Sequence, residues 1–384
     1  MRPKTEMTDK ATERIMIIAG EASGDLHGSS LVRALRSRAP GLELFGVGGE
    51  KMKAEGFEAL FHINQMAFLG FVEVVKHLPY ILNVQKILIN EAVKRGVKTV
   101  VLIDYPGFNL NIAKKFKRLG IRVVYYIAPQ VWAWGQGRVK KLKVRTDIVL
   151  SVFPFEEKFF REHGVNVRFV GNPLSERVSG YGFLPEAEFR KRFGLDPDKK
   201  ILAVLPGSRK HEVELLLKPA LEAAEILEKE FGFQSIVGCA DTIDEDFIRK
   251  IKPGGYTLIK GYQFEIKKYA GFGIVKSGTS TMEAALLDMP LVIIYKTTAL
   301  TYNIGKRLIK IGNLGMVNII AGENIAPELI QDEVTGEKIS ATVSTILNDP
   351  SLLKKQKDGF ARIRENLGKH TASETAAKVI LNEA

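Results

Sequence analysis

Residues 14–31 read RIMIIAGEASGDLHGSSL, and residues 199–217 read KKILAVLPGSRKHEVELLL. Each stretch runs from a short apolar segment through a turn of small residues into a segment with the pattern of an amphipathic helix. A strand, a tight turn and a helix in this order open a parallel α/β sheet. Because the pattern occurs near the start and again near the middle of the chain, the sequence predicts two domains that begin alike.

Further strand-like segments follow each opening at the spacing of alternating strands and helices. They are residues 42–47, 99–104, 122–127, 147–152, 167–171, 233–238, 256–261, 271–276 and 291–296. We therefore predict an α/β protein with two doubly wound, Rossmann-like parallel sheets that face a central cleft. The expected boundaries are a first domain over residues 1–171, a linker over 172–200 and a second domain over 201–350. Residues 351–384 are expected to form two helices, broken near Gly368, and the family resemblance described below implies that they pack back on the first domain.

Composition limits the classes of protein to which the chain can belong. A length of 384 residues with 45% hydrophobic and 26% charged residues suits a folded protein of two domains. Cys239 is the only cysteine, which excludes intramolecular disulfides. The sequence has no cluster of residues at metal-ligand spacing, so it does not indicate a catalytic metal. No apolar run reaches the ~20 residues of a membrane span, and the polar N-terminus does not resemble a signal peptide. We therefore expect a cytoplasmic protein.

The net charge of +12 favours an anionic partner, such as nucleic acid, an anionic membrane surface or a phosphorylated substrate. The sequence has neither zinc-finger spacing nor the aromatic and basic motif of an RNA-recognition domain. We therefore expect no specific nucleic acid partner.

One loop of the second half has the residues of a phosphate site. Ser277, Gly278 and Thr279 follow a strand-like segment and open a helix, whose N-terminal N–H groups attract anions. Glu283 lies about one turn further on, where a carboxylate can bind a ribose diol. An ordinary helix cap explains the same residues without a ligand.

A second loop strengthens the case for phosphate. Gly207 ends another strand, Ser208 can cap the next helix, and the planar guanidinium of Arg209 suits phosphate. Two such helix starts in one half favour a nucleoside diphosphate, although an arginine there can also be a simple surface charge. Neither loop matches the P-loop pattern GxxxxGK[ST].

Acidic residues follow two strands of the first half. Asp104 ends one strand-like segment, while Glu21, Asp25 and His27 follow another. Strand ends face the ligand in such sheets, and a carboxylate there can take a proton from an attacking hydroxyl group. An isolated aspartate also caps turns, so both roles stay open for Asp104, and we expect His27 to be structural. Glu21 interrupts the bare backbone that a dinucleotide needs, which argues against NAD.

Residues 66–75, MAFLGFVEVV, are unusually apolar. We expect a helix that continues through residues 76–88, with Pro79 kinking it or ending its first part. A wholly buried helix and a patch exposed for contact with lipid both explain this composition.

These segments resemble one family over nearly the whole chain: the lipid-A-disaccharide synthases, glycosyltransferases of the GT-B type. The matching segments are AGEASGD (19–25), GVGGEKMKAEGFE (46–58), LGFVEV (69–74), LIDYPGFN (102–109), YYIAPQVWAWGQGRVKKL (125–142), LPGSR (205–209), SGTSTME (277–283) and NLGMVNIIAG (313–322). Their order and spacing fit the family, and the PQVWAW box is particularly specific.

The resemblance implies an inverting transfer of 2,3-diacylglucosamine from UDP-2,3-diacylglucosamine to the 6-hydroxyl group of 2,3-diacylglucosamine 1-phosphate. The products are UDP and the β-1,6-linked lipid A disaccharide 1-phosphate, and neither a cofactor nor a metal is implied. Asp104 maps onto the general base, and Glu21 maps onto a second carboxylate that orients the acceptor or assists the base. Some relatives carry a further aspartate where this chain has Gly107, which puts more weight on Asp104.

On the donor side, the resemblance implies that Arg209 contacts the diphosphate or the acceptor phosphate. Glu283 falls on the expected ribose contact, and Asn318 matches a polar residue of the site. The remaining donor candidates are Gly207, Ser208, Ser277, Gly278 and Thr279. Whether Trp132 and Trp134 of the PQVWAW box stack on sugar or pack in the core stays open.

Because the implied substrates carry acyl chains, the resemblance places the protein at the cytoplasmic face of the inner membrane, and it leaves a homodimer open. It also favours partial exposure of the apolar stretch to lipid, with the candidates Met66, Phe68, Leu69, Phe71, Val72 and Val75. The alternatives are another UDP-sugar enzyme of this fold, namely an N-acetylglucosaminyltransferase or a UDP-sugar epimerase, and a non-catalytic nucleotide-sugar or lipid-binding module.

Overall fold

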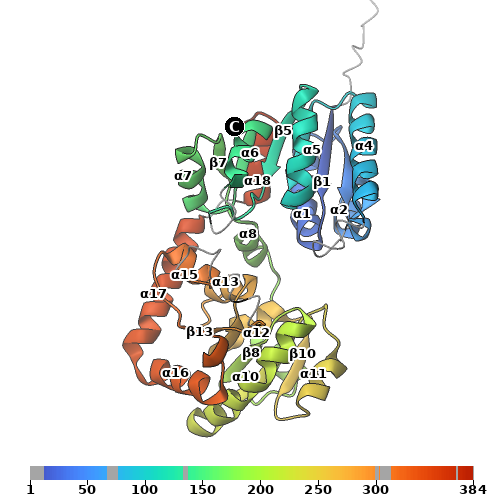
Figure 1. The fold of residues 1–384 in the computed structure, drawn as a ribbon. Coiled ribbons are helices and arrows are strands. Elements are labelled where there is room, and N and C mark those ends of the chain that lie inside the picture. The colour runs from blue at the N-terminus through green and yellow to red at the C-terminus, as the bar shows by residue number, and fades with distance from the viewer. Residues whose placement is uncertain are drawn as a thin grey trace, which may run out of the picture. The chain divides into compact units, whose positions relative to one another are not determined.

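The computed structural model describes residues 13–66, 77–132, 137–298, 302, 313–368 and 371–383. The chain divides into two compact units (Figure 1). Residues 1–173 and 369–384 form the first unit, and residues 174–368 form the second.

The sheet of the first unit has the strand order β3-β2-β1-β4-β5-β6-β7, and all of its strand pairs are parallel. Its strands are β1 (Arg14–Ala19), β2 (Glu43–Gly48), β3 (Glu58–His62), β4 (Thr99–Ile103), β5 (Arg122–Tyr126), β6 (Ile148–Ser151) and β7 (Val167–Phe169). β4 is buried along its whole length because helices cover both faces of the sheet. One face packs against α1 (Ala22–Arg38), α2 (Glu50–Ala54) and α18 (Ala372–Ile380). The other packs against α4 (Leu78–Lys94), α5 (Pro106–Arg118), α6 (Gly137–Arg145) and α7 (Pro154–Glu162).

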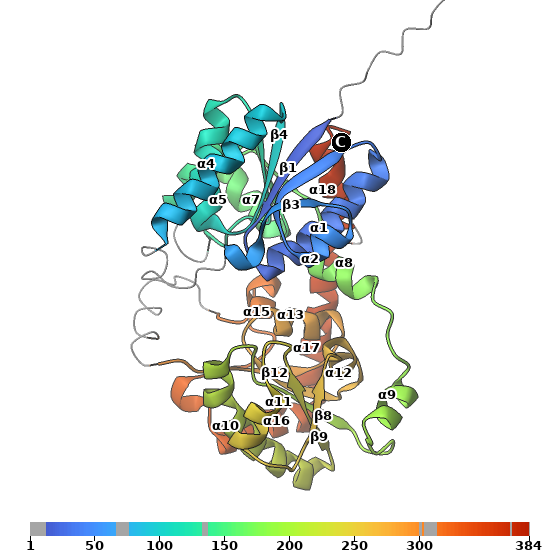
Figure 2. The same ribbon diagram turned by 90° about the vertical axis from the view of Figure 1, so that its right-hand side faces the viewer.

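The sheet of the second unit has the order β10-β9-β8-β11-β12-β13 and is also parallel throughout. Its strands are β8 (Ile201–Leu205), β9 (Gln234–Cys239), β10 (Thr257–Lys260), β11 (Phe272–Lys276), β12 (Leu291–Tyr295) and β13 (Glu328–Ile330). One core cluster joins this sheet to α10 (Lys210–Phe231), α11 (Glu245–Ile251) and α16 (Gly336–Asn348), and Figure 2 shows this part of the unit. α12 (Gln263–Tyr269), α13 (Thr279–Leu286), α15 (Met316–Ala321) and α17 (Pro350–Leu367) pack against one another.

Both sheets follow the same chain path. In each unit the first strand lies between the second and the fourth, so the strand order reverses between β1 and β4 and again between β8 and β11. This is the doubly wound arrangement, and ligands bind at the carboxyl ends of the strands where the order reverses. The prediction of two doubly wound α/β domains is therefore confirmed.

Two short strands had no counterpart in the sequence pattern. β3 is only partly buried, and β13 has three residues. Both lie at the edge of their sheets. An edge strand is covered less completely than a central one, so it does not need the continuous apolar run by which the other strands were recognised.

The segment predicted as a linker is structured. Residues 172–200 contain α8 (Pro173–Ser179) and α9 (Glu186–Arg192). The Tyr181 hydroxyl group donates to Glu265 Oε1 at 3.0 Å, and the ring of the fully buried Phe189 packs on that of Tyr269. These contacts attach the segment to α12 of the second unit.

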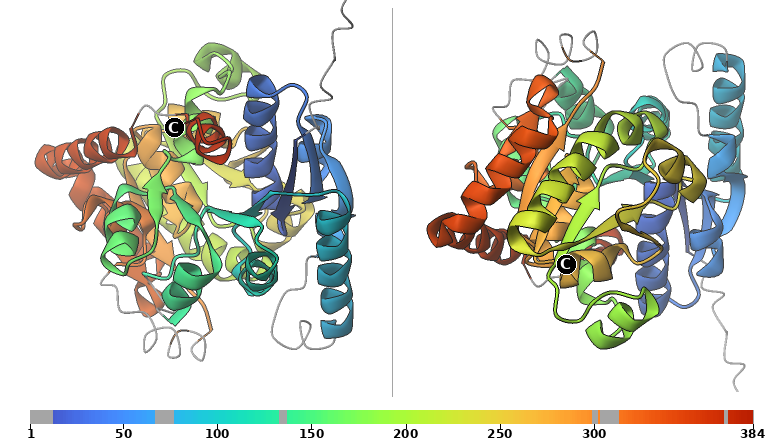
Figure 3. Two further views of the ribbon diagram at one scale, coloured as in Figure 1. Left: turned by 90° about the horizontal axis from the view of Figure 1, so that it is seen from above. Right: turned by 90° about the horizontal axis from the view of Figure 1, so that it is seen from below.

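The two C-terminal helices belong to different units. α17 stays with the second unit, while α18 packs against α1 of the first (Figure 3, left). Arg38 Nη2 lies 2.8 Å from Glu374 Oε2, and Arg122 Nη1 donates to the carbonyl of Ile380 at 2.6 Å. Only the second of the two predicted helices therefore packs on the first unit.

The apolar stretch 66–75 lies outside the described residues except for Met66. Met66 is fully buried in the core of the first unit, so it does not belong to a lipid-exposed patch. α4 begins at Leu78 and carries Pro79 in its first turn, where the missing N–H costs nothing. Pro79 therefore does not kink α4, and the part of the predicted helix that precedes it lies outside the described residues. The other lipid-contact candidates, Phe68, Leu69, Phe71, Val72 and Val75, lie outside the described residues.

No helix within the ranges that the structure describes combines the length and the apolar character that crossing a bilayer requires.

Candidate functional site

The first candidate site lies at the carboxyl edge of the first sheet, where the strand order reverses. Ala19 and Ile103 are paired in register at the ends of β1 and β4, so the loops after these strands start side by side. Glu21 occupies the N-cap position of α1, and Asp104 follows β4 directly. The charge of Glu21 acts on the pKa of Asp104, so the structure brings the two predicted catalytic carboxylates together.

The backbone at Asp104 is strained. Asp104 and Tyr105 have φ angles of 44° and 47°, in the left-handed region that non-glycine residues rarely adopt. Asn109 Nδ2 and the Tyr125 hydroxyl group donate to the Asp104 carbonyl at 2.8 and 2.6 Å. The Asp104 N–H donates to the carbonyl of Tyr126 at 3.1 Å. Strain that surrounding bonds hold in place is typical of functional positions.

The surroundings make Asp104 more basic than an ordinary aspartate. Burial, followed by the charge of Glu21, raises the pKa of Asp104 from 3.8 to about 6, against the opposing effect of a backbone hydrogen bond from Tyr105. A carboxylate with this pKa is largely ionised at pH 7 and accepts a proton more readily than an exposed one. The arrangement therefore suits a general base.

Other polar and small residues of this loop serve the fold. A Cβ at residue 20 would overlap the ring of Tyr105, so Gly20 makes room for that ring. The Tyr105 hydroxyl group donates to the Met66 carbonyl at 2.8 Å. The buried Asp25 carboxylate accepts the N–H groups of Gly49 and Met52 at 2.7 and 3.1 Å. Asp25 thus caps α2 rather than facing a ligand.

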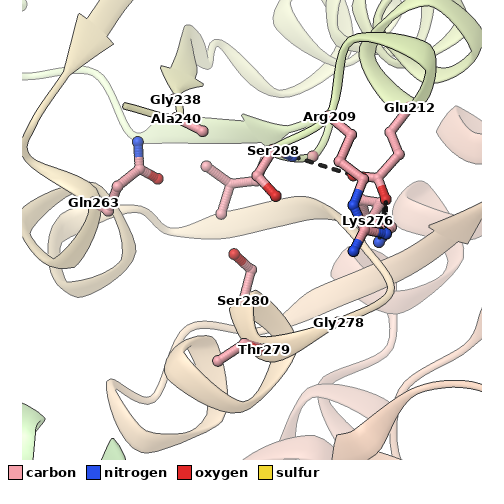
Figure 4. Close-up of a pocket in the computed structure, with 12 residues that line it drawn as sticks. Ser208, Arg209, Glu212, Gly238, Ala240, Gln263, Lys276, Gly278, Thr279 and Ser280 are labelled. Atoms are coloured by element: carbon pink, nitrogen blue, oxygen red, sulfur yellow. Dashed lines mark hydrogen bonds and ion pairs between the residues drawn. The ribbon is translucent and has the colours of Figure 1, made fainter. Parts of the chain in front are cut away.

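The second candidate site is a pocket of about 330 Å³ at the carboxyl edge of the second sheet, again where the strand order reverses (Figure 4). α10 and α13 both begin at this pocket, so the N–H groups of two helix starts are available to an anion there. The predicted donor residues that line it are Gly207, Ser208, Arg209, Gly278 and Thr279. The pocket is also lined by Leu205, Glu212, Gly238, Ala240, Gln263, Lys276 and Ser280.

Glu212 and Lys276 form an ion pair at one end of the pocket, and the sequence pattern had not identified either residue. Lys276 Nζ lies 2.8 Å from Glu212 Oε1, and the Ser208 N–H donates to Glu212 Oε2 at 3.2 Å. Burial alone would raise the pKa of Glu212, but the hydrogen bond and charge of Lys276 hold it below its ordinary value. The ionised Glu212 therefore fixes both the loop after β8 and the lysine. The position of Lys276 at the end of a strand was the signal that could have identified it.

Gly207 is required at this bend. Its φ of +122° lies in the region that favours glycine, and a Cβ would stand 2.5 Å from Glu212 Oε2. Arg209, the N-cap residue of α10, follows two positions later with its side chain 71% exposed. The guanidinium reaches Glu212 Oε1 only at 3.5 Å, which leaves it able to turn towards a ligand.

Three predicted donor residues do not line the pocket. The buried Ser277 donates its hydroxyl group to the Leu314 carbonyl at 3.1 Å, and Glu283 pairs with the fully buried Lys267 at 2.8 Å. Asn318 is fully buried. Its amide nitrogen donates to Asn324 Oδ1, the Ala326 carbonyl and Glu328 Oε1. Its amide oxygen accepts the N–H groups of Ile325 and Ala326. We therefore reassign Asn318 from donor contact to support of the adjoining loop, while the ribose contact of Glu283 stays a prediction.

Trp132 packs inside the first unit. Its Nε1 donates to Glu156 Oε1 at 3.0 Å, and its ring meets that of Phe155 edge to face at 4.9 Å. Burial raises the pKa of Glu156 to about 7, against the hydrogen bonds from Trp132 and two backbone N–H groups. Of the two roles left open for this tryptophan, the structure supports packing. Trp134 lies outside the described residues.

The chemistry of the two sites is complementary. The first offers a partly buried, basic carboxylate, and the second offers cations and helix N-termini that stabilise negative charge. In the part of the chain that the structure describes, no three His, Cys, Asp or Glu side chains are grouped as metal ligands would be.

Sequence comparison identifies a family. The family model described as lipid-A-disaccharide synthetase matches residues 15–381. A lipid-A-disaccharide synthase of Geobacter metallireducens is 42% identical over 373 residues, which cover 96% of this chain and 97% of the relative. The synthase of Myxococcus xanthus is 40% identical over 96% of this chain and 97% of the relative.

Structural comparison identifies the fold. A UDP-GlcNAc 2-epimerase from Neisseria meningitidis, solved with UDP-GlcNAc bound, superposes with a TM-score of 0.63 at 11% identity, over 96% of this chain and all of that one. The calicheamicin glycosyltransferase superposes with a TM-score of 0.62 at 14% identity, over 97% of this chain and 98% of that one. The fold, with two Rossmann-like domains in one chain, is therefore that of GT-B glycosyltransferases.

Proposed function

Because this chain belongs to the lipid-A-disaccharide synthase family, it is a glycosyltransferase, and we propose that Asp104 is the general base of its reaction. The reaction transfers 2,3-diacylglucosamine from UDP to the 6-hydroxyl group of 2,3-diacylglucosamine 1-phosphate. The observation that carries the proposal is the strained, partly buried Asp104 beside Glu21, with a pKa of about 6. No observation favours an epimerase or a binding module, since the epimerases share only the fold.

In the proposed step, the Asp104 carboxylate accepts the proton of the acceptor hydroxyl group as its oxygen attacks the anomeric carbon of the donor. The new C–O bond forms while the bond between the anomeric carbon and the UDP oxygen breaks, and UDP leaves with the electron pair. A single displacement inverts the anomeric configuration. Glu21 contributes by keeping Asp104 basic, because its negative charge disfavours ionisation of the neighbouring carboxyl group.

On the donor side, we assign the UDP diphosphate to the end of the pocket where Arg209 and Lys276 lie, next to the starts of α10 and α13. Both cations and both helix N-termini would stabilise the charge that develops on the departing UDP. Gln263 lies at the opposite end of the pocket (Figure 4), which we assign to the nucleoside.

We also propose that the protein works at the cytoplasmic face of the inner membrane. The support is the pair of acyl chains on each substrate together with a net charge of +12, which favours anionic lipid. A homodimer stays a prediction that sedimentation of the purified protein would check.

The test is to incubate the purified protein with both lipid substrates and to measure disaccharide and UDP. We expect Asp104→Asn to lower turnover by about 10²–10⁴-fold, the usual contribution of a general base, while UDP affinity stays within about twofold. Glu162→Gln, an exposed carboxylate of the same unit, is the matched control and should keep full turnover. Unchanged turnover in Asp104→Asn would remove this residue as the base, and a wild-type protein that makes no disaccharide would contradict the reaction itself.

A further inference from the structure

A groove of about 460 Å³ runs between α4 and α5 of the first unit. Leu78, Ile81 and Leu82 of α4 form one wall, and Leu78 and Leu82 remain 47% and 50% exposed. Apolar side chains of this size rarely stay exposed together along a groove unless a ligand or partner covers them. The volume lies within the range of small-molecule sites, about 300–1,000 Å³.

The groove begins at the proposed catalytic loop. Tyr105 and Gly107, one and three residues after Asp104, line one end of it. Nothing lies within 4 Å of the position that a Cβ would take at Gly107, so the groove is open at this point. From Gly107 the lining continues along α5 to Arg118, about 16 Å further at 1.5 Å per residue. A ligand in the groove would therefore reach from the base along the length of α5.

The α5 wall is cationic. Lys114, Lys115 and Arg118 line it, and the described lining contains no acidic residue. Lys115 Nζ donates to Gln85 Oε1 at 3.0 Å, and Gln85 is only 3% exposed, so this polar pair is built into the groove. Lys114 and Arg118 are exposed and can turn to an anion. An apolar wall facing a cationic one fits an amphiphile that carries both a hydrocarbon chain and a phosphate.

We propose that this groove binds the acceptor lipid, with an acyl chain along the α4 wall and its phosphate at Lys114 and Arg118. The inference rests on the proposed function, because the groove opens beside the base that would deprotonate the acceptor. The acceptor fits better than the donor, since it carries a phosphate monoester, whereas the donor diphosphate is assigned to the pocket of the second unit.

The test for the apolar wall is steady-state kinetics in detergent micelles with each substrate varied in turn. Leu82→Glu and Leu82→Trp should raise the acceptor KM by about tenfold, because roughly two methylene groups of the acyl chain lose apolar contact. The kcat and the donor KM should stay within about twofold of the wild-type values. Glutamate places a charge in the groove and tryptophan fills it, so an equal rise of the acceptor KM in both variants points to the groove and not to a side effect of one substitution. Val93→Glu is the matched control, because Val93 is exposed on the same helix but does not line the groove.

The test for the cationic wall compares the acceptor with 2,3-diacylglucosamine that lacks the phosphate. The wild-type protein should favour the phosphorylated acceptor, and the double variant Lys114→Glu/Arg118→Glu should lose about tenfold of that preference while its donor KM stays unchanged. Lys86→Glu makes a single charge reversal outside the lining and should keep the preference.

The outcomes separate the two proposals. An active wild-type protein whose Leu82 variants keep the acceptor KM, or whose double variant keeps the preference for phosphate, would overturn the groove as the acceptor site. Loss of folding stability in the Leu82 variants with kinetics unchanged would mean that the chain itself covers the groove, which also overturns it. A wild-type protein that makes no disaccharide would instead contradict the proposed function.

Discussion

Replacing Asp104 by asparagine is expected to stabilise the first unit at neutral pH while it abolishes the proposed base. Burial and the charge of Glu21 raise the pKa of Asp104 from 3.8 to about 6, so the folded protein holds the ionised carboxylate at a cost. A rise of about two pH units corresponds to ~3 kcal/mol at pH values above 6. Asparagine keeps the shape and tolerates the left-handed backbone at this position, but it carries no charge.

The sign of the pH dependence follows from proton binding. Between pH 3.8 and about 6 the folded state binds more protons at Asp104 than the unfolded state, so this residue makes the wild type less stable as pH rises. Below that window both states are protonated and the cost vanishes. The advantage of Asp104→Asn should therefore be small at pH 4, grow through pH 5–6 and level off at ~3 kcal/mol above pH 7, plus any gain that does not depend on pH.

The assay is urea unfolding followed by tryptophan fluorescence at pH 4, 5, 6 and 7.5. Both tryptophans of the chain, Trp132 and Trp134, fall within the sequence of the first unit, so the signal follows that unit. Glu162→Gln, at an exposed position, should stay within about 0.5 kcal/mol of the wild type at every pH. If the gain in unfolding free energy of Asp104→Asn is the same at pH 4 and pH 7.5, the ionised carboxylate of Asp104 does not destabilise the folded protein, and the pKa of Asp104 is not raised.

Two further substitutions test the neighbours of the reaction. Glu21→Gln removes the charge that helps to raise the pKa of Asp104, so the acidic limb of the kcat/KM profile should move to lower pH. A profile that does not move would show that Glu21 does not act on the base. Arg209→Ala should lower kcat/KM by about 30-fold, or ~2 kcal/mol, because it removes a charge-assisted contact with phosphate. The neighbouring control, Lys210→Ala, should change kcat/KM little. A loss below tenfold in Arg209→Ala would contradict the contact with phosphate.

Local pattern was sufficient to predict most of the strands and their turns. β4 and β8 are buried at every position, and apolar at all of them except Thr99, because both faces of their sheets are covered. Such runs are recognisable without knowing the neighbours. The loops after them are predicted to bind a ligand for a related reason, since the carboxyl ends of parallel strands lie together at one edge of the sheet. Local pattern therefore singles out Asp104, Glu21 and Arg209 as candidates, and their roles stay proposals.

What depends on distant partners could not be predicted in this way. Asn318 had the character of a ligand-binding amide, but its partners Ile325 and Ala326 satisfy it inside the fold. Trp132 was ambiguous because its partner Glu156 lies 24 residues away, on α7. A polar residue in a motif can hold the motif together or contact the substrate, and only the positions of its hydrogen-bond partners distinguish these roles.

The repeated chain path explains how one protein holds two opposite electrostatic environments. In both units the residues that we propose to act in the reaction lie at the ends of the first and fourth strands, at the reversal of strand order. Asp104 needs a negative neighbour and burial, because a cation beside it would lower its pKa and make it a weaker base. The diphosphate needs the reverse, namely Lys276, Arg209 and two helix starts. The loops at a single reversal of strand order could not place a negative environment for the base and a positive one for the diphosphate within a few ångströms of each other. Two copies of the same topology give each environment its own pair of loops. A cation introduced in the same loop, as in Ala22→Lys directly after Glu21, should therefore oppose the charge of Glu21 and move the acidic limb of the kcat/KM profile to lower pH, although the donor pocket is untouched.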